Sequence, residues 1–154
     1  MKNKIIQLLS VLLLLSCQNN DIEVFNGSDT SISKLNGSWI VINYWADWCA
    51  PCIKEIPELN QFAEENKDIK VYTFNFDYLD VDDLEPIAKK FNILVPSLIT
   101  HPRDIWGIKT PPAVPATFFI NPEGELLSEE ELAEKNQECD LYLSFAHTNY
   151  SNRE

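Results

Sequence analysis

The chain has 154 residues, of which 45% are hydrophobic and 11% aromatic, which is enough apolar material to bury the core of one domain. Its formal net charge of −12 at pH 7 argues against nucleic-acid binding and against electrostatic docking on anionic lipid, because both require an excess of Lys and Arg. We interpret the acidic composition as a solvated protein surface.

The first residues have the pattern of a segment that is removed from the mature protein. Met1 to Lys4 is basic, and Ile5 to Leu15 is mostly apolar but too short to span a membrane as a stable helix. Residues 1–16 are therefore predicted to be a secretory signal. The segment ends in Leu-Leu-Ser-Cys at Cys17, which resembles the lipobox of bacterial lipoproteins and implies that Cys17 is lipidated. The alternative is an ordinary signal peptide with a chance cysteine, or a short buried helix.

Export would place the protein in the bacterial cell envelope, on the periplasmic or extracytoplasmic face, attached to the membrane through the lipid on Cys17. Disulfides persist in such a compartment. Residues 17–34 are rich in Asn, Asp and Ser and are predicted to be a lipidated tether that leads into a short first strand or hairpin. Residues 35–154 are predicted to form a single domain.

The rest of the chain is organised around Cys49-Ala50-Pro51-Cys52. Residues 38–45 form an almost continuous apolar run, which is typical of a strand buried on both faces. Apolar residues then recur at helical spacing from Cys49 to about Asn66. Cys49 is thus expected at a helix N-terminus, where the backbone amides and the helix dipole stabilise a thiolate. Two thiols at this spacing can close into a disulfide and reopen.

Half of a structural zinc site is the alternative interpretation of such a pair, and it needs a second pair of ligands at suitable spacing. Only Cys17, Cys139, His101 and His147 remain, and none of them are paired at that spacing. We therefore predict a redox-active pair with no metal and no other cofactor. Cys139 is interpreted as an odd buried or tail cysteine, with a third redox thiol as the alternative.

The following segments predict an alternation of strands and helices. Residues 70–76 and 93–99 are predicted strands, and Pro96 indicates that the second is an edge strand or that it marks the strand start. Between them a helix is expected to bury the apolar side chains of Leu84, Ile87, Ala88 and Phe91. Residues 101–112 are predicted to be a connection with Trp106 and Ile108 packed inward.

Four aspartates precede that helix, namely Asp77, Asp80, Asp82 and Asp83. We interpret them as helix capping and dipole complementarity. A calcium site is the alternative, although the segment lacks the Gly and the terminal Glu of an EF-hand loop.

The last part of the chain predicts a hairpin and then a helix. Residues 114–120 are a predicted strand, which a turn at residues 121–124 joins to residues 125–127. Ser128 with Glu131 has the spacing of a capping box for a final helix. Beyond Asn136 the helical pattern weakens, and residues 139–146 alternate as in a strand.

These motifs carry a resemblance to the thioredoxin superfamily. Trp48-Cys49-Ala50-Pro51-Cys52 after an apolar strand, Pro57 inside the following helix, and Val114-Pro115 at the start of a strand are similar to its pattern. The segment from Asn43 to Cys49 and Glu55 three residues past Cys52 resemble more narrowly the membrane-anchored, extracytoplasmic TlpA/ResA-type thiol-disulfide oxidoreductases. The likeness covers about residues 35–127.

The resemblance implies an α/β, thioredoxin-like fold, in which helices flank a central mixed β-sheet and an extra strand-helix unit separates the CxxC helix from the cis-Pro strand. It implies Cys49 as the exposed nucleophile, Cys52 as the buried resolving thiol and Pro115 in cis beside them. A cis proline lacks an amide donor, so the backbone of Val114 can pair with an extended substrate peptide. An ordinary trans proline is the alternative. Trp48 is expected to shield the disulfide.

Glu55 is a candidate proton acceptor because Asn43 cannot be one. The matching strand position of cytoplasmic thioredoxins carries a buried Asp that moves protons for the second thiol. Glu55, one helical turn beyond Cys52, can substitute as the base. The alternative is a solvated acid that is favoured near a helix N-terminus.

The resulting hypothesis is a thiol-disulfide oxidoreductase that acts on protein thiols and disulfides, more as a reductant than as an oxidant, in cytochrome c maturation or in general thiol reduction. The resemblance implies that a membrane thiol-electron donor recharges it. Ala50 and Pro51 supply no positive side chain, which weighs against a strong oxidant. The alternatives are a disulfide-donating oxidase and a non-catalytic lipoprotein binding module with a permanent disulfide.

Overall fold

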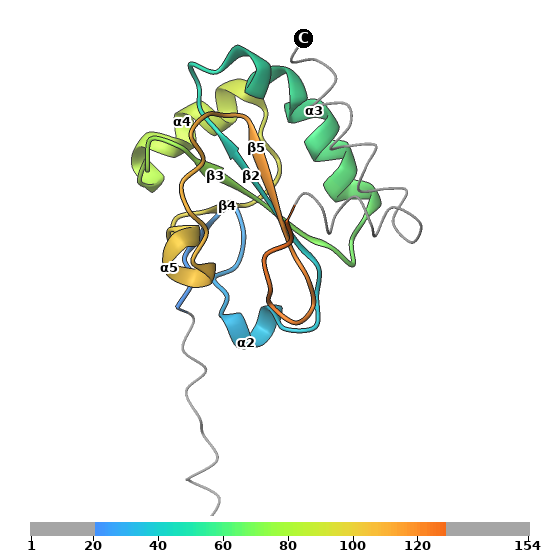
Figure 1. Cartoon of the computed structure of the whole chain (residues 1–154). Helices are drawn as coiled ribbons and strands as arrows, with labels where there is room; N and C mark the ends of the chain where they lie inside the picture. The colour runs from blue at the N-terminus through green and yellow to red at the C-terminus, as the bar shows by residue number, and fades with distance from the viewer. Residues whose placement is uncertain (1–20, 129–154) are drawn as a thin grey trace, which may run out of the picture.

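The computed structural model describes residues 21–128 (Figure 1). Its elements follow the order β1 (Val24–Phe25), α2 (Ile32–Leu35), β2 (Ile40–Trp45), α3 (Ala50–Glu65), β3 (Lys70–Asn75), α4 (Val81–Phe91), β4 (Ser97–Leu98), α5 (Pro102–Trp106) and β5 (Ala116–Ile120). The five strands form one sheet in the order β1-β4-β3-β2-β5. Strands β4, β3 and β2 are parallel, whereas β1 and β5 pair antiparallel at the two edges.

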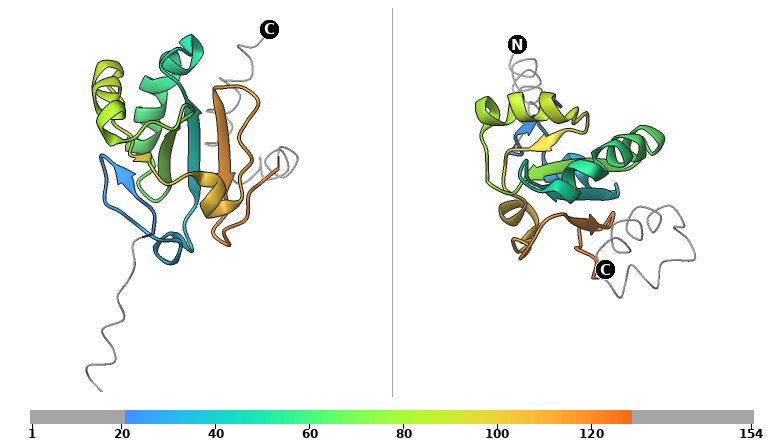
Figure 2. Two further views of the ribbon diagram at one scale, coloured as in Figure 1. Left: turned by 90° about the vertical axis from the view of Figure 1, so that its left-hand side faces the viewer. Right: turned by 90° about the horizontal axis from the view of Figure 1, so that it is seen from above.

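Helices cover both faces of this mixed sheet, as the sequence predicted, and α3 and α5 lie on opposite sides (Figure 2). On the α3 side, Val41 of β2 packs with Leu59 and Phe62 of α3. On the other side, Ile42 and Tyr44 pack in a cluster with residues of α2 and the segment around α5. Successive residues of a strand point to opposite faces, so β2 contributes to both cores.

The predicted strand at residues 38–45 is confirmed as β2, and all of its residues are buried. The predicted strand at residues 70–76 is β3, and the predicted helix that buries Leu84 and Ala88 is α4. The short first strand expected within residues 17–34 is β1, which belongs to a hairpin because Ile22 and Thr30 form an antiparallel bridge. Its residues therefore form part of the sheet.

The predicted strand at residues 93–99 is mostly wrong, because only Ser97 and Leu98 form β4. Of the two positions that Pro96 suggested, the strand start is confirmed, and the edge position is wrong because β4 lies between β1 and β3. Pairing with β3 is limited to Thr73 opposite Ser97. Pro96 has no amide hydrogen and contributes only its carbonyl oxygen, which accepts from the Thr73 amide at 2.9 Å.

Two short helices were not expected. Helix α5 begins at Pro102 after His101, whose Nδ1 accepts from the amide of Arg103, and it ends at Gly107 in the left-handed conformation. The inward packing expected within this connection is confirmed, since Ile108 is fully buried and Trp106 packs on the same cluster. Helix α2 is a single turn before β2.

The hairpin after β5 is confirmed. The amide of Asn121 donates to the carbonyl of Glu125, and the amide of Leu127 donates to the carbonyl of Phe119. Gly124 has a φ of 84°, which favours glycine at the end of the turn. The turn fixes β5 beside β2 and thereby fixes the segment that precedes β5.

Several predictions fall outside the described residues. They concern the secretory signal and Cys17 at one end, and the final helix, the alternating segment and Cys139 at the other. Within residues 21–128, every helix is too short or too polar to span a bilayer.

Candidate active site

Cys49 and Cys52 form a disulfide at the N-terminus of α3, with their Cα atoms 5.3 Å apart. Cys49 is the N-cap residue of this helix, and its sulfur accepts from the amide of Cys52 at 3.2 Å. This amide and the helix dipole favour negative charge on the Cys49 sulfur. The exposed fraction is 4% for Cys49 and 0% for Cys52, so the expectation of an exposed Cys49 is wrong for this disulfide form, in which Cys49 is only slightly more accessible than its partner.

The Val114–Pro115 peptide bond is cis, as the resemblance implied. The carbonyl oxygen of Val114 lies 3.5 Å from the Cys49 sulfur. Both residues are half-buried and directly precede β5, which starts at Ala116. The structure therefore brings the backbone of Val114 and Pro115 beside the disulfide, although the two segments are 65 residues apart in sequence.

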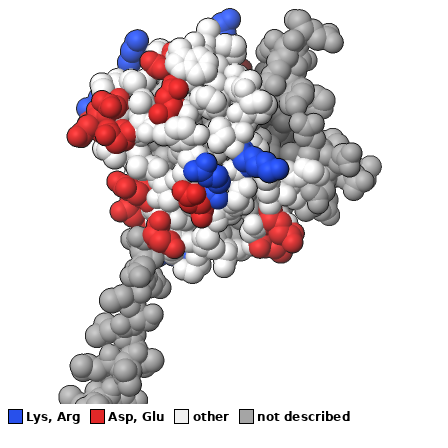
Figure 3. Space-filling view, turned by 60° about the vertical axis from the view of Figure 1, so that its left-hand side comes forward, with Lys and Arg blue, Asp and Glu red and all other residues white. Residues whose placement is uncertain are grey.

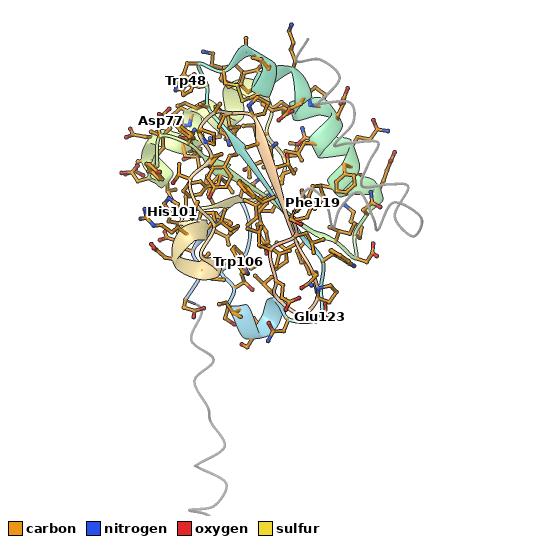
Figure 4. All side chains as sticks on the ribbon, in the orientation of Figure 1. Trp48, Asp77, His101, Trp106, Phe119 and Glu123 are labelled. Carbon is orange, nitrogen blue, oxygen red and sulfur yellow. A yellow bond between two sulfur atoms is a disulfide. The ribbon has the colours of Figure 1, made fainter. Side chains whose placement is uncertain are left out.

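Trp48 is 62% exposed, and a hydrogen bond holds its indole ring in place. Its Nε1 donates to Oδ2 of Asp77 at 2.7 Å, and the ring packs edge-on against Phe76. Trp48 and Asp77 lie together at the upper end of the molecule in Figure 4. Asp77, which the sequence suggested only as part of an acidic cluster, positions this aromatic side chain next to Cys49.

Glu55 is buried, with an exposed fraction of 4%, so its interpretation as a solvated acid is wrong. One turn beyond Cys52 on α3, its Oε1 accepts from Nδ2 of Asn43 at 2.9 Å. The same Nδ2 donates to Oγ1 of Thr117 in β5 at 3.1 Å. Neither bond was predicted, because each joins segments whose sequences carry no common pattern.

The surroundings of the disulfide are apolar on the sheet side. Cys49 and Cys52 pack in one cluster with Trp45, which is 1% exposed and fills the core. Leu84 and Ala88 of α4 complete the cluster. Electrostatic interactions are stronger in such a setting than in water. The hydrogen bonds to the Cys49 sulfur and to Glu55 are therefore stronger than hydrogen bonds that are exposed to solvent.

A group of aromatic side chains lies on the opposite face of the sheet. His101 packs against Phe74 and Tyr78, with its ring centroid 4.9 Å from each of theirs, and those two rings also contact each other. Burial, followed by the charge of Arg103, lowers the pKa of His101 below its usual value, with Asp104 opposing. Burial and, to a smaller extent, Tyr78 raise the pKa of Tyr44, with Arg103 opposing.

The expected capping and dipole role is confirmed for the three aspartates at the start of α4, whereas Asp77 binds Trp48. Oδ1 of Asp80 accepts from the amide of Asp83 at 3.0 Å, and Asp82 and Asp83 lie in the first turn. Figure 3 shows acidic side chains spread over the face that contains this helix. Within residues 21–128, no group of three or more His, Cys, Asp or Glu side chains has a geometry that could hold a metal ion.

Comparison with known proteins identifies relatives over most of the described chain. The family model described as "AhpC/TSA family" matches residues 16–128. The thiol-disulfide oxidoreductase ResA of Bacillus subtilis (strain 168) is 27% identical over 108 residues, which are 69% of this chain and 60% of that protein. A ResA of Bacillus cereus is 28% identical over 116 residues, 73% of this chain and 65% of that protein. The chain thus covers less than two thirds of either relative.

Solved structures support the fold. StoA from Bacillus subtilis superposes with a TM-score of 0.53 at 23% identity, covering 73% of this chain and 95% of that one. A thiol:disulfide interchange protein of the thioredoxin family from Chlorobium tepidum TLS gives a TM-score of 0.55 at 21% identity, covering 70% and 80%. At these identities the likeness shows a thioredoxin-like fold.

Proposed function

We propose, on the premise that the chain belongs to the AhpC/TSA family, that it is a thiol-disulfide oxidoreductase that exchanges dithiol and disulfide with protein substrates. The observation that carries this proposal is the Cys49–Cys52 disulfide at the N-terminus of α3, with the Val114 carbonyl 3.5 Å from the Cys49 sulfur. The disulfide is itself the redox group, so the reaction needs no further cofactor.

The chemistry starts from the reduced protein. The thiolate of Cys49 attacks one sulfur of a substrate disulfide, so that a mixed disulfide forms and the other substrate sulfur leaves as a thiolate. The thiolate of Cys52 then attacks the Cys49 sulfur and releases the second substrate thiolate. Two electrons pass to the substrate, and the protein returns to the disulfide form seen in the structure.

Glu55 is the base in the second step. Burial disfavours the thiolate of Cys52, so this thiol needs a proton acceptor before it attacks. The buried carboxylate of Glu55, one helical turn away, takes the proton from Cys52 and returns it in the reverse reaction. Glu55→Gln is expected to slow disulfide exchange by about tenfold or more, since it retains the shape of the side chain and removes the base.

The substrate peptide binds along the segment before β5. Val114 offers its backbone groups to an extended chain, Pro115 keeps this edge open because it has no amide hydrogen, and Trp48 supplies an exposed apolar surface beside the disulfide. The side chains of these residues carry no charge, which fits a protein that accepts several thiol substrates.

We assign the protein the direction of a reductant, which a membrane thiol-electron donor recharges. The two residues between the cysteines carry no positive charge, so the thiolate of Cys49 is not stabilised to the extent that a strong oxidant requires. Cytochrome c maturation and general thiol reduction both need this direction. A disulfide-donating oxidase and a binding module with a permanent disulfide are the competing functions.

One pair of variants tests which cysteine attacks the substrate and which one resolves the mixed disulfide. Cys52→Ser is expected to trap mixed disulfides between Cys49 and substrate proteins, because the resolving thiol is missing. Cys49→Ser should trap few, and it is the matched control. Non-reducing gels with mass spectrometry of the captured proteins give the result. Equal capture by both variants, or none by either, would contradict the assignment.

A redox titration separates the three functions. The Cys49–Cys52 couple is equilibrated with glutathione buffers, and free thiols are counted by alkylation and mass. A reductant opens only in the most reducing mixtures, whereas an oxidant is already reduced in weakly reducing ones. A permanent structural disulfide stays closed in all of them.

We also propose that residues 1–16 are a lipoprotein signal and that a lipid on Cys17 attaches the protein to the extracytoplasmic side of the bacterial membrane. The basic start, the apolar stretch and the Leu-Leu-Ser-Cys sequence support this in combination. Cys17→Ser should therefore move the protein from the membrane pellet to the soluble extracytoplasmic fraction. Unchanged sedimentation with membranes would refute the lipid anchor.

A further inference from the structure

Four strands place a polar side chain at the same level of the sheet. Thr73 pairs with Ser97 and with Asn43, and Asn43 pairs on its other side with Thr117. These residues, which we call the polar row, extend from β4 to β5 on the face that α3 covers. Ser97, Thr73 and Asn43 are at most 3% exposed, and Thr117 is half-buried. In β2, the polar row lies between the buried apolar residues Val41 and Trp45.

The side chains of the polar row have two kinds of hydrogen-bond partner, one for Ser97 and Thr73 and another for Asn43. The hydroxyls of Ser97 and Thr73 donate to backbone carbonyls, at 3.3 and 3.4 Å. Asn43 instead uses side chains alone, since its Nδ2 donates to Oε1 of Glu55 at 2.9 Å and to Oγ1 of Thr117 at 3.1 Å. The half near α3 is therefore a side-chain network that joins β2, β5 and α3.

The chemistry of an amide group fixes the direction of these two bonds. The Nδ2 group of Asn43 has two hydrogens, and each one has its own acceptor. The reverse orientation would place the amide oxygen against a carboxylate, which accepts hydrogen bonds and cannot donate. Only the observed orientation is compatible with an ionised Glu55.

A donor at one carboxyl oxygen has two effects. It stabilises the ionised form of Glu55 in a buried place where desolvation disfavours charge. It also occupies one of the two lone pairs of Oε1 and makes that oxygen less basic, which favours Oε2 as the oxygen that binds a proton taken up by the carboxyl. Thr117 accepts the second hydrogen of Asn43 and so prevents the amide from turning away from Glu55.

We propose that Asn43 and Thr117 are positioning residues for the Glu55 carboxyl: Asn43 holds Oε1 as a hydrogen-bond acceptor, the proton exchanged with Cys52 is carried on Oε2, and Thr117 holds the Asn43 amide in place. The role of this proton in catalysis rests on the proposed function of Glu55. The two hydrogen bonds and their effect on the carboxyl do not.

Thr117→Val and Thr117→Ser form a matched pair of variants. Valine has the shape of threonine but cannot accept from Asn43, whereas serine keeps the hydroxyl. The Glu55 carboxyl is followed by ¹³C NMR against pH in the oxidised protein, where the disulfide cysteines do not titrate. The Glu55 signal is assigned from its loss in Glu55→Gln. We expect Thr117→Val to raise the titration midpoint by about half a unit, and Thr117→Ser to retain the wild-type midpoint.

Asn43→Leu removes the donor itself and should raise the midpoint by about one unit, because hydrogen bonds to charged groups are the stronger ones. In the reduced protein, the acid side of the pH profile of disulfide exchange should move in the same direction in Thr117→Val and return in Thr117→Ser. A loss of packing alone would lower the rate at every pH without moving the profile. Circular dichroism confirms that each variant is folded.

The outcomes separate this proposal from the proposed function. Wild-type midpoints in Thr117→Val, with slow exchange in Glu55→Gln, would overturn the positioning role and leave Glu55 as the base. A raised midpoint in Thr117→Val, with wild-type exchange in Glu55→Gln, would retain the positioning of the carboxyl and refute its function as the base. Equal midpoints in the valine and serine variants would overturn the role of the Thr117 hydroxyl.

Discussion

Asn43 and Tyr44 are neighbours in β2, but their side chains lie on opposite faces of the sheet in different surroundings. The Nδ2 group of Asn43 donates to Glu55 and Thr117. The hydroxyl of Tyr44 is buried and has no hydrogen-bond partner within the described part of the chain, and its ring packs edge-on against Phe74. Asn43 is therefore connected to other segments by side-chain hydrogen bonds, whereas Tyr44 is held by aromatic packing.

This difference follows the position of α3. Asn43 lies on the face that α3 covers, where a buried carboxyl near two cysteines needs donors. Tyr44 lies on the other face, where aromatic side chains pack on the same strands. Replacing a polar group should therefore have a large effect on the first face and a small effect on the second.

The largest effect is expected for Asn43→Leu, which keeps roughly the size of the side chain and removes the donor to Glu55. The free energy of unfolding should fall by about 2 kcal/mol near neutral pH, because a buried acceptor loses its bond to an N–H group. The bond favours the ionised carboxyl, so the difference from wild type should shrink as the pH falls and Glu55 gains a proton. Urea unfolding at pH 4.5 and pH 7.5 measures both quantities. A deficit that stays the same at the two pH values would mean that packing alone accounts for it.

A smaller effect is expected at His101. Its Nδ1 accepts from the Arg103 amide, so only the neutral imidazole caps α5, and its pKa is lowered. Between the lowered pKa and the ordinary value of about 6.5, the unfolded chain binds more protons than the folded one. The contribution of His101 is therefore complete above that window and is lost as the pH falls through it.

His101→Asn keeps an acceptor at the N-cap position and removes the titration. The stability difference between wild type and this variant, measured by urea unfolding from pH 5 to pH 7.5, should change in favour of wild type as the pH rises. A constant difference over this range would show that the cap does not depend on protonation.

The smallest effect is expected for Tyr44→Phe. The hydroxyl that is removed has no partner within residues 21–128, so the free energy of unfolding should stay the same or rise by less than about 1 kcal/mol. The rate of disulfide exchange should equal that of wild type. A loss of stability similar to that of Asn43→Leu would erase the contrast between the two faces.

The sequence was sufficient for elements with a strong internal pattern. The continuous apolar run of β2 and the helical spacing in α3 and α4 identified those elements, because each depends on burial along its own length. The cysteine pair and Val114-Pro115 stood out for the same reason, since each motif is a local sequence. The capping role of Asp80 likewise depends on a residue three positions away.

The features that the sequence did not predict depend on contacts between distant segments. β4 is short because it pairs with β3 only at Ser97, and the apolar residues before Pro96 gave it a strand pattern. Glu55 has the sequence pattern of a polar helix face, and its burial becomes tolerable because Asn43 in β2 offers it a donor. Helix α5 has five residues, which is too few for a helical period to be visible.

The direction from which the chain enters the fold bears on how the protein would stand on a membrane. The blue start of the described residues lies toward the lower end of the molecule in Figure 1, whereas Trp48 lies at the upper end in Figure 4. If Cys17 carries the proposed lipid, four residue steps separate it from Asp21, a reach of at most about 14 Å. The domain would then stand close to the bilayer with its disulfide facing away from it. The disulfide would then be accessible to freely diffusing proteins. A membrane-bound partner would need an ectodomain long enough to reach the side of the domain that faces away from the bilayer.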